Sequence, residues 1–204
     1  RRWRERGGAS HGGDCVGYGE QTPYLPWRGV LSSIAGLSPR LSVRERLTRL
    51  ARVLQRLSDH SPVADSEAVS SLHPGEMESS EDYWLERLPL LADILGLETQ
   101  ETTLTRNLSQ DLRRDNVFAT IQTIVLHQAQ QRPLLILLED THWSDELSLE
   151  LGASLATEIS NQPLFLVLVH RPLSDPIPMP YQRLDALSHS SRMQINELDP
   201  KASL

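Results

Sequence analysis

The sequence predicts an α/β fold in which a parallel sheet is flanked by helices. Two short runs are uniformly apolar, residues 134–138 (LLILL) and residues 164–169 (LFLVLV). Runs of this length without polar residues are typical of strands that are buried on both faces of a parallel sheet. Between them, residues 145–159 carry leucines at four-residue spacing, which predicts a helix that Ser144 or Asp145 caps. A strand, a helix and a strand with short connections indicate a right-handed parallel crossover.

The composition excludes several classes of function. The chain has 204 residues, enough for one sizeable α/β domain, and its net charge of −7 argues against a nucleic-acid-binding surface. Its one cysteine, Cys15, excludes an internal disulfide and a zinc site built from cysteines, and it suits a reducing cytoplasm. No apolar run approaches the ~20 residues of a membrane span. We therefore expect a cytoplasmic protein without direct nucleic-acid or membrane contacts.

The chain divides into a short lead-in and one domain. Residues 1–13 are basic and then glycine-rich, which predicts a disordered lead-in, and residues 14–18 predict a short strand. Residues 14–204 are expected to form one partial α/β domain, with a helical insertion over residues 28–114. The strands that carry the candidate site are expected within residues 133–198.

Several segments of that domain have recognisable periodicity. Residues 42–57 and 83–97 are amphipathic at helical spacing, and Pro89 predicts a kink or two short helices in the second. Residues 58–82 are rich in Ser, Asp, Glu and Pro and predict a flexible loop. A further helix is expected over residues 116–131. Asp115 is its predicted N-cap, and the alternating run at residues 193–198 predicts a last strand.

Two acids follow the first apolar run directly. In PLLILLEDTHWSD, residues 133–145, Glu139 and Asp140 stand beyond the carboxyl end of a strand, where open α/β sheets bind ligands. A magnesium–phosphate site needs one carboxylate for the metal or its waters and a second to orient the attacking water. The hypothesis is therefore a magnesium–nucleotide site of Walker B type. The alternative is a pair of solvated acids at a strand end, because so short a motif has many false matches.

An arginine closes the second apolar run. Arg171 follows residues 164–169 closely and, if the two strands are parallel, lies at the same edge of the sheet as the acids. A guanidinium there could contact a terminal phosphate, and the alternative is an ordinary surface arginine. The pattern GxxxxGK[ST] of a phosphate-binding loop does not occur, since the only lysine, Lys201, is followed by Ala202. This segment therefore cannot present a complete phosphate-binding loop.

The remaining candidates are weaker. The seven histidines lack metal-ligand spacing and are interpreted as structural or surface residues, and Cys15 as a packed residue. There is no GxSxG motif, which leaves a serine hydrolase without support. The chain begins at Arg1 without a methionine and stops soon after a predicted strand, so we expect a piece of a longer protein.

Five strings, in order, resemble the ATPase module of STAND-class signalling ATPases: YGEQTPYLPWRGVL, LERLPLLADILGL, LTRNLSQDLRR, PLLILLEDTHWSDELS and PLFLVLVHRP. The most similar subgroup is the bacterial AAA-like module that accompanies adenylate and guanylate cyclase domains, transcriptional regulators and helical repeats. The resemblance covers about residues 14–198. It implies a P-loop NTPase-like sheet, with Glu139 and Asp140 as the magnesium-binding and water-activating acids and Arg171 as a phosphate sensor. Which acid takes which role stays open, because the family's usual order is two aspartates.

The resemblance also implies what lies outside the segment. In the family the phosphate-binding loop lies upstream, on a central strand beside the sensor strand, so the chain is expected to be truncated just after the phosphate-binding helix. ATP and Mg²⁺ are the implied cofactors, and flanking cyclase, DNA-binding or helical-repeat domains are the implied partners. The expected function is part of an ATP-hydrolysing switch. The alternative is a degenerate, non-hydrolysing scaffold for protein contacts.

Overall fold

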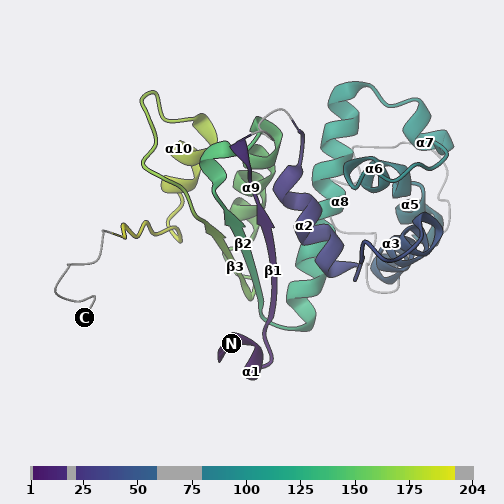
Figure 1. Cartoon of the computed structure of the whole chain (residues 1–204), viewed down its shortest axis with the longest axis horizontal. Helices are drawn as coiled ribbons and strands as arrows, with labels where there is room; N and C mark the ends of the chain where they lie inside the picture. Colours follow the sequence, from purple (N-terminus) through teal and green to yellow (C-terminus); the bar gives the residue numbers. More distant parts are fainter. Residues whose placement is uncertain (1, 18–21, 59–79, 196–204) are drawn as a thin grey trace.

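The computed structural model describes residues 2–17, 22–58 and 80–195. At its centre lies a parallel sheet of three described strands in the order β1-β2-β3 (Figure 1). The strands are β1 (Ala9–Asp14), β2 (Leu134–Glu139) and β3 (Leu164–Leu168). Helix α9 (Glu146–Glu158) connects β2 to β3 and forms the predicted parallel crossover. The predicted α/β class, a parallel sheet flanked by helices, is confirmed.

Most of the other described helices lie between β1 and β2 in the sequence. They are α2 (Leu25–Ile34), α3 (Val43–Ser58), α5 (Ser80–Leu85), α6 (Leu88–Ile94), α7 (Thr103–Arg106) and α8 (Gln110–Gln131), while α1 (Arg2–Glu5) precedes β1 and α10 (Met179–Asp185) follows β3. In Figure 1 the helices α3, α5, α6 and α7 form a group beside the sheet, and α8 lies between that group and the strands. Helix α10 lies beyond β3, at the opposite end of the structure from that group, and packs on α9.

The helix predictions are confirmed in outline, with one wrong cap. The amphipathic stretch at residues 42–57 forms α3, and the stretch that contains Pro89 is split into α5 and α6. Pro89 lies in the first turn of α6, where its missing N–H removes no helical hydrogen bond. Helix α8 begins earlier than predicted. Ser109, not Asp115, is its N-cap and accepts a hydrogen bond from Leu112 N at 3.4 Å, while the Asp115 carboxylate pairs with Arg114 at 3.0 Å.

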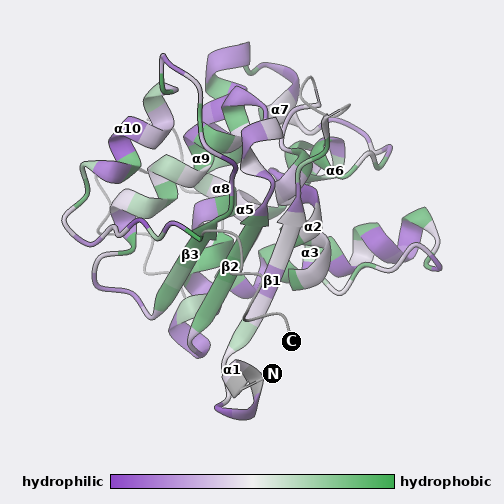
Figure 2. Ribbon diagram, turned by 60° about the vertical axis from the view of Figure 1, so that its left-hand side comes forward, coloured by the Kyte–Doolittle hydropathy of each residue, from purple (hydrophilic) through white to green (hydrophobic). Residues whose placement is uncertain are grey.

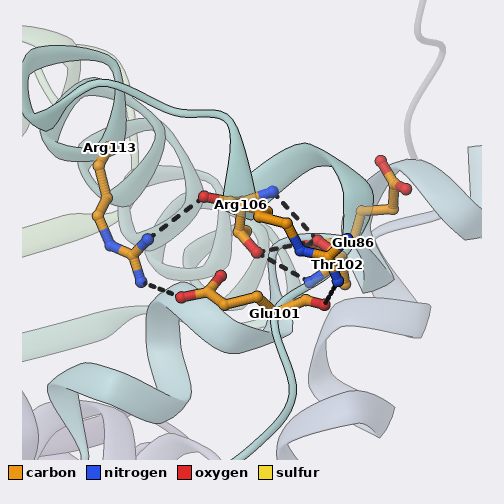
Figure 3. A network of polar contacts seen from close by, with 6 residues as sticks. Glu86, Glu101, Thr102, Arg106 and Arg113 are labelled. Carbon is orange, nitrogen blue, oxygen red and sulfur yellow. Dashed lines mark hydrogen bonds and ion pairs between the residues drawn. The ribbon is translucent and has the colours of Figure 1, made fainter.

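A polar network fixes the short helices to one another (Figure 3). Thr102 caps α7 and its hydroxyl donates to the Glu86 carbonyl at 2.8 Å, which joins α7 to the end of α5. Arg113 in α8 donates to Glu101 Oε1 at 2.9 Å and to the Thr105 carbonyl at 3.4 Å. These bonds hold the α7 turn between α8 and the α5–α6 junction.

The N-terminal prediction is wrong for the described part of residues 1–13. Instead of a disordered lead-in, the chain forms α1 and then β1, and the strand expected at residues 14–18 ends at Asp14. The sequence ASHGGD has weak strand propensity. It is extended because it pairs with β2 along its whole length and because α2 packs directly on its glycines. Partners far away in the sequence therefore impose this strand.

Burial of the sheet is asymmetric, which corrects the expectation of strands buried on both faces. In β2, Leu134, Ile136 and Leu138 are buried, whereas Leu135 and Leu137 are only partly buried. In β3, Phe165 is 62% exposed although every residue of the strand is apolar. Figure 2 shows β2 and β3 in the colour of hydrophobic residues and β1 paler.

Two further predictions fall largely outside the described residues. Residues 193–195 are described and do not form a strand, and the rest of the strand expected at residues 193–198 lies outside the described residues. Residues 59–79 of the loop expected at residues 58–82 also lie outside them, and the expected bounds are wrong at both ends because Ser58 ends α3 and residues 80–82 begin α5. Within the described part of the chain, no helix has the length and apolar character needed to cross a membrane.

Candidate functional site

The carboxyl ends of the three strands share one edge of the sheet because the strands are parallel. Asp14 at the end of β1 is in register with Glu139 at the end of β2, which places their Cα atoms roughly 5 Å apart. Backbone bonds continue the ladder past the strands: Cys15 N donates to the Glu139 carbonyl at 3.0 Å, and Val169 N donates to the Leu138 carbonyl at 2.9 Å. This edge therefore collects the residues that follow all three strands.

Asp140 has an unusual backbone conformation at that edge. With φ 53° and ψ 37° it lies in the left-handed region, which costs a residue other than glycine roughly 1–2 kcal/mol, although aspartate tolerates it better than most. Its carbonyl accepts a hydrogen bond from Trp143 N at 2.9 Å, which closes the short turn Thr141–Trp143. The carboxylate is 60% exposed. The turn therefore presents a charged side chain to solvent directly beyond the buried strand.

The turn after Asp140 is attached to the end of β3. Thr141 N donates to the Val169 carbonyl at 2.9 Å, so the segment after the acids and the segment before Arg171 are hydrogen-bonded to each other. Arg171 follows Val169 by two positions, is exposed, and forms no ion pair with any described residue. The structure thus places Glu139, Asp140 and Arg171 at one edge of the sheet, from two adjacent strands.

His142 is a neighbour of the acids that sequence reasoning assigned to structure or surface. Its Nδ1 lies 3.9 Å from Asp140 Oδ1, and its ring packs on Trp143 with 4.9 Å between ring centroids. Both ring nitrogens are buried and have no hydrogen-bond partner among the described residues. No spacing pattern marks this histidine, since its position depends on the tight turn that follows β2.

Cys15 adjoins the same edge but remains a packed thiol. It is buried, and burial is the main cause that raises its pKa to about 11, although the Ser144 hydroxyl lowers it and Asp145 raises it further. At neutral pH the side chain is therefore a protonated thiol and not a thiolate nucleophile. The geometry agrees with the sequence-based interpretation of Cys15 as a small packed residue.

The carboxylates at this edge suit Mg²⁺, because Mg²⁺ does not need a site built from protein ligands alone. Among the described residues, no group of three or more His, Cys, Asp or Glu side chains is arranged to hold a metal ion. Mg²⁺ usually binds one or two carboxylates together with waters and substrate phosphates. The exposed carboxylates of Glu139 and Asp140 fit that requirement, and Asp14 is a third carboxylate close by that sequence reasoning missed.

A separate hollow lies at the opposite end of β1. Gly7, Gly8, Ser10 and Arg132 line it, together with Ala9 and His11. Because these residues surround the start of β1, the hollow is far from the strand ends that carry the acids. It is not part of the candidate site.

Comparison with known proteins places the chain in a protein family. A family model described as AAA ATPase domain matches residues 1–168 of the chain. The matched span contains β1, β2 and β3 and therefore both acids, and it ends shortly before Arg171. No curated protein and no solved structure matches the chain significantly.

Proposed function

This chain belongs to the AAA ATPase domain family, and on that premise we propose that it is part of an ATP-binding and ATP-hydrolysing regulatory switch. Membership of the family implies nucleotide binding. The observation that carries the proposal is the shared edge, where the acids after β2 lie next to the segment after β3 that bears Arg171. Nucleotides bind at this edge in open α/β sheets.

Each of the three residues is proposed to have a defined role. Glu139 and Asp140 would hold Mg²⁺, which when bound neutralises phosphate charge, and one of them would orient the attacking water and accept its proton. The exposed guanidinium of Arg171 would contact the terminal phosphate, where a charge-assisted hydrogen bond is strong. The left-handed backbone at Asp140 supports this assignment, because such strain is concentrated at functional sites.

The unpaired lateral side of β3 supports the proposed position of the phosphate-binding strand. In the described sheet β3 is the outermost strand, so no described strand pairs with its outer backbone groups. The STAND-class modules that the sequence resembles place the phosphate-binding strand beside the sensor strand. A partner strand there would cover the exposed edge.

We propose further that the module is bacterial and cytoplasmic and belongs to the STAND class. ATP would favour one arrangement of the module and hydrolysis would release it, so that the populations of two states shift. The output would then come from flanking cyclase, DNA-binding or helical-repeat domains. The five strings quoted above support this finer assignment.

The test is Mg²⁺-dependent phosphate release by the full-length protein. Asp140→Asn and Glu139→Gln remove one charge each with little change in shape, and roughly 100-fold lower kcat is expected for the acid that handles the proton. Arg171→Ala should weaken turnover as well. Glu98→Gln is the matched control, because Glu98 is an exposed carboxylate in the loop between α6 and α7, and it should leave turnover unchanged.

Two outcomes would contradict the proposal in different ways. Unchanged turnover in Asp140→Asn and Glu139→Gln would show that these acids are not the catalytic ones. A wild-type protein that does not hydrolyse ATP at all would instead favour the alternative, a non-hydrolysing scaffold for protein contacts.

A further inference from the structure

Tyr181 in α10 contacts both turns that carry the proposed phosphate-site residues. Its hydroxyl donates a hydrogen bond to Thr141 Oγ1 at 2.8 Å, and Thr141 directly follows Asp140. Its ring packs edge-on against the ring of His170 with 4.9 Å between centroids, and His170 directly precedes Arg171. Tyr181 itself is only 4% exposed. One buried side chain therefore touches the neighbours of both the acid and the arginine.

The hydrogen bonds around Thr141 have a fixed direction. Its hydroxyl donates to the Val169 carbonyl at 3.3 Å, so its oxygen is the acceptor for the Tyr181 hydroxyl. Its backbone N–H donates to the same carbonyl at 2.9 Å, and the residue is 1% exposed. Thr141 is thus held on one side by the end of β3 and on the other by α10. Because Thr141 is fixed, the left-handed backbone of Asp140 next to it is fixed too.

The segment before Arg171 is constrained through the same tyrosine. His170 Nδ1 lies 2.7 Å from the Arg171 carbonyl, and since a carbonyl only accepts, Nδ1 carries the proton and donates. This bond sets the orientation of the imidazole ring, and that ring packs on Tyr181. A displacement of Tyr181 would therefore disturb the Arg171 turn as well as the Asp140 turn.

We propose that Tyr181 is a positioning residue that couples the orientation of Asp140 to that of Arg171. This inference rests on the proposed ATP-hydrolysing function. Helix α10 packs on α9, the helix that follows the acid turn. A movement of α10 would therefore displace both turns, because Tyr181 contacts a residue in each of them. Burial raises the pKa of the Tyr181 phenol, although the bond to Thr141 lowers it, so the hydroxyl remains a neutral donor at physiological pH.

The kinetic test uses Tyr181→Phe in the full-length protein, which removes the hydroxyl and keeps the ring against His170. We expect kcat for ATP hydrolysis to fall about fivefold, the effect of one neutral hydrogen bond, with KM for ATP unchanged. Thr141→Val also breaks the bond to the Val169 carbonyl, so its loss should be at least as large, and the double variant should lose no more than Thr141→Val alone because both changes break the bond between Tyr181 and Thr141. Tyr83→Phe in α5 is the control and should leave kcat unchanged.

An unchanged kcat in Tyr181→Phe would overturn the coupling, as would losses that multiply in the double variant. If the wild-type protein does not hydrolyse ATP, the proposed function fails and the coupling is decided by NMR of the full-length protein with labelled threonine methyl groups. His170→Ala should shift the Thr141 methyl signal, and at least half of that shift should disappear in a Tyr181→Phe background. An equal shift in both backgrounds would mean that Tyr181 does not transmit the change.

Discussion

Gly13 in β1 lies directly beneath the carbonyl of Pro26 in α2. A Cβ atom at Gly13 would lie 1.8 Å from the Pro26 oxygen, closer than any real contact. A Cβ at Gly29, one turn further along α2, would lie 2.7 Å from the Gly12 oxygen. Two glycines, one on each element, thus allow the helix backbone to rest on the strand backbone, and this packing holds β1 beside the acid-bearing strand.

The first prediction compares two glycines in the same strand. Gly13→Ala should destabilise the domain by about 3 kcal/mol because the backbone of α2 must move. Gly12→Ala is the matched control, since its Cβ would meet only the Leu137 oxygen at an ordinary 3.5 Å, and its stability should change by less than about 1 kcal/mol. Pulse proteolysis of the full-length protein in urea measures both. Equal losses would show that the contact between α2 and β1 is not tight.

A second prediction follows from the left-handed backbone of Asp140. Asp140→Gly should be about 1 kcal/mol more stable than Asp140→Ala, because alanine pays the steric cost of positive φ and glycine does not. Asp140→Asn should fold as well as the wild type, since asparagine tolerates this conformation. Hydrogen exchange of the peptide that spans the turn distinguishes the variants. If the amides of this peptide exchange equally slowly in Asp140→Ala and Asp140→Gly, the turn does not hold residue 140 in the left-handed conformation.

A third prediction concerns the cap of α9. Asp145 accepts hydrogen bonds from Ser148 N at 2.9 Å and from the Ser148 hydroxyl at 2.5 Å, both buried. Asp145→Ala should cost about 1–2 kcal/mol, whereas Asp145→Asn keeps one acceptor oxygen and should cost less. Thermal unfolding of the two variants side by side tests this order. The reverse order would mean that the charge, and not the cap geometry, matters.

The fourth prediction is a pH dependence in the network of Figure 3. The Thr105 hydroxyl and then Arg113 lower the pKa of Glu101, so its contribution to stability is complete above the unfolded value of about 4.3 and is lost as pH falls through the lower folded value. Because the pair is largely solvated, Glu101→Gln should cost less than about 1 kcal/mol at pH 7. That difference between wild type and variant should shrink below pH 4. A constant difference across pH would rule out the linkage.

The last prediction separates this segment from the full-length protein. The isolated 204-residue chain should be poorly stable and should give no measurable heat of ATP binding by calorimetry, because its sequence contains no GxxxxGK[ST] loop and the exposed edge of β3 has no described strand beside it. Tight ATP binding by this chain alone would contradict the proposed division of the nucleotide site.

Sequence patterning predicted the parts of the fold whose signals are local. Strands β2 and β3 are uniformly apolar, and α9 has a regular period and a capping aspartate, so all three were predicted to within a residue or two. Strand β1 was missed because its glycines specify contact with α2 and not extended backbone. Asp14 was consequently placed at the start of a strand instead of at its end, beside Glu139.

The tertiary contacts of the site could not be predicted from a single sequence. The bond between Tyr181 and Thr141 joins residues in separate elements, and no spacing rule links them. Likewise, His142 lies beside Asp140 only because the backbone reverses in a left-handed residue. Patterning finds the residues that follow strands, whereas three-dimensional packing determines which of them face one another.

The register of the sheet has a consequence for the order of folding. Leu134 pairs with Leu164 across the single helix α9, whereas it pairs with Ala9 across every helix from α2 to α8. Closing the longer loop costs more chain entropy, and contacts between distant residues slow folding. We therefore expect β2, α9 and β3 to form a nucleus and β1 to join it last. In pulse-labelled hydrogen exchange during refolding, β3 amides should gain protection before β1 amides. The domain would thus assemble its acid and arginine turns first and add the glycine-rich strand beside β2 as the final step.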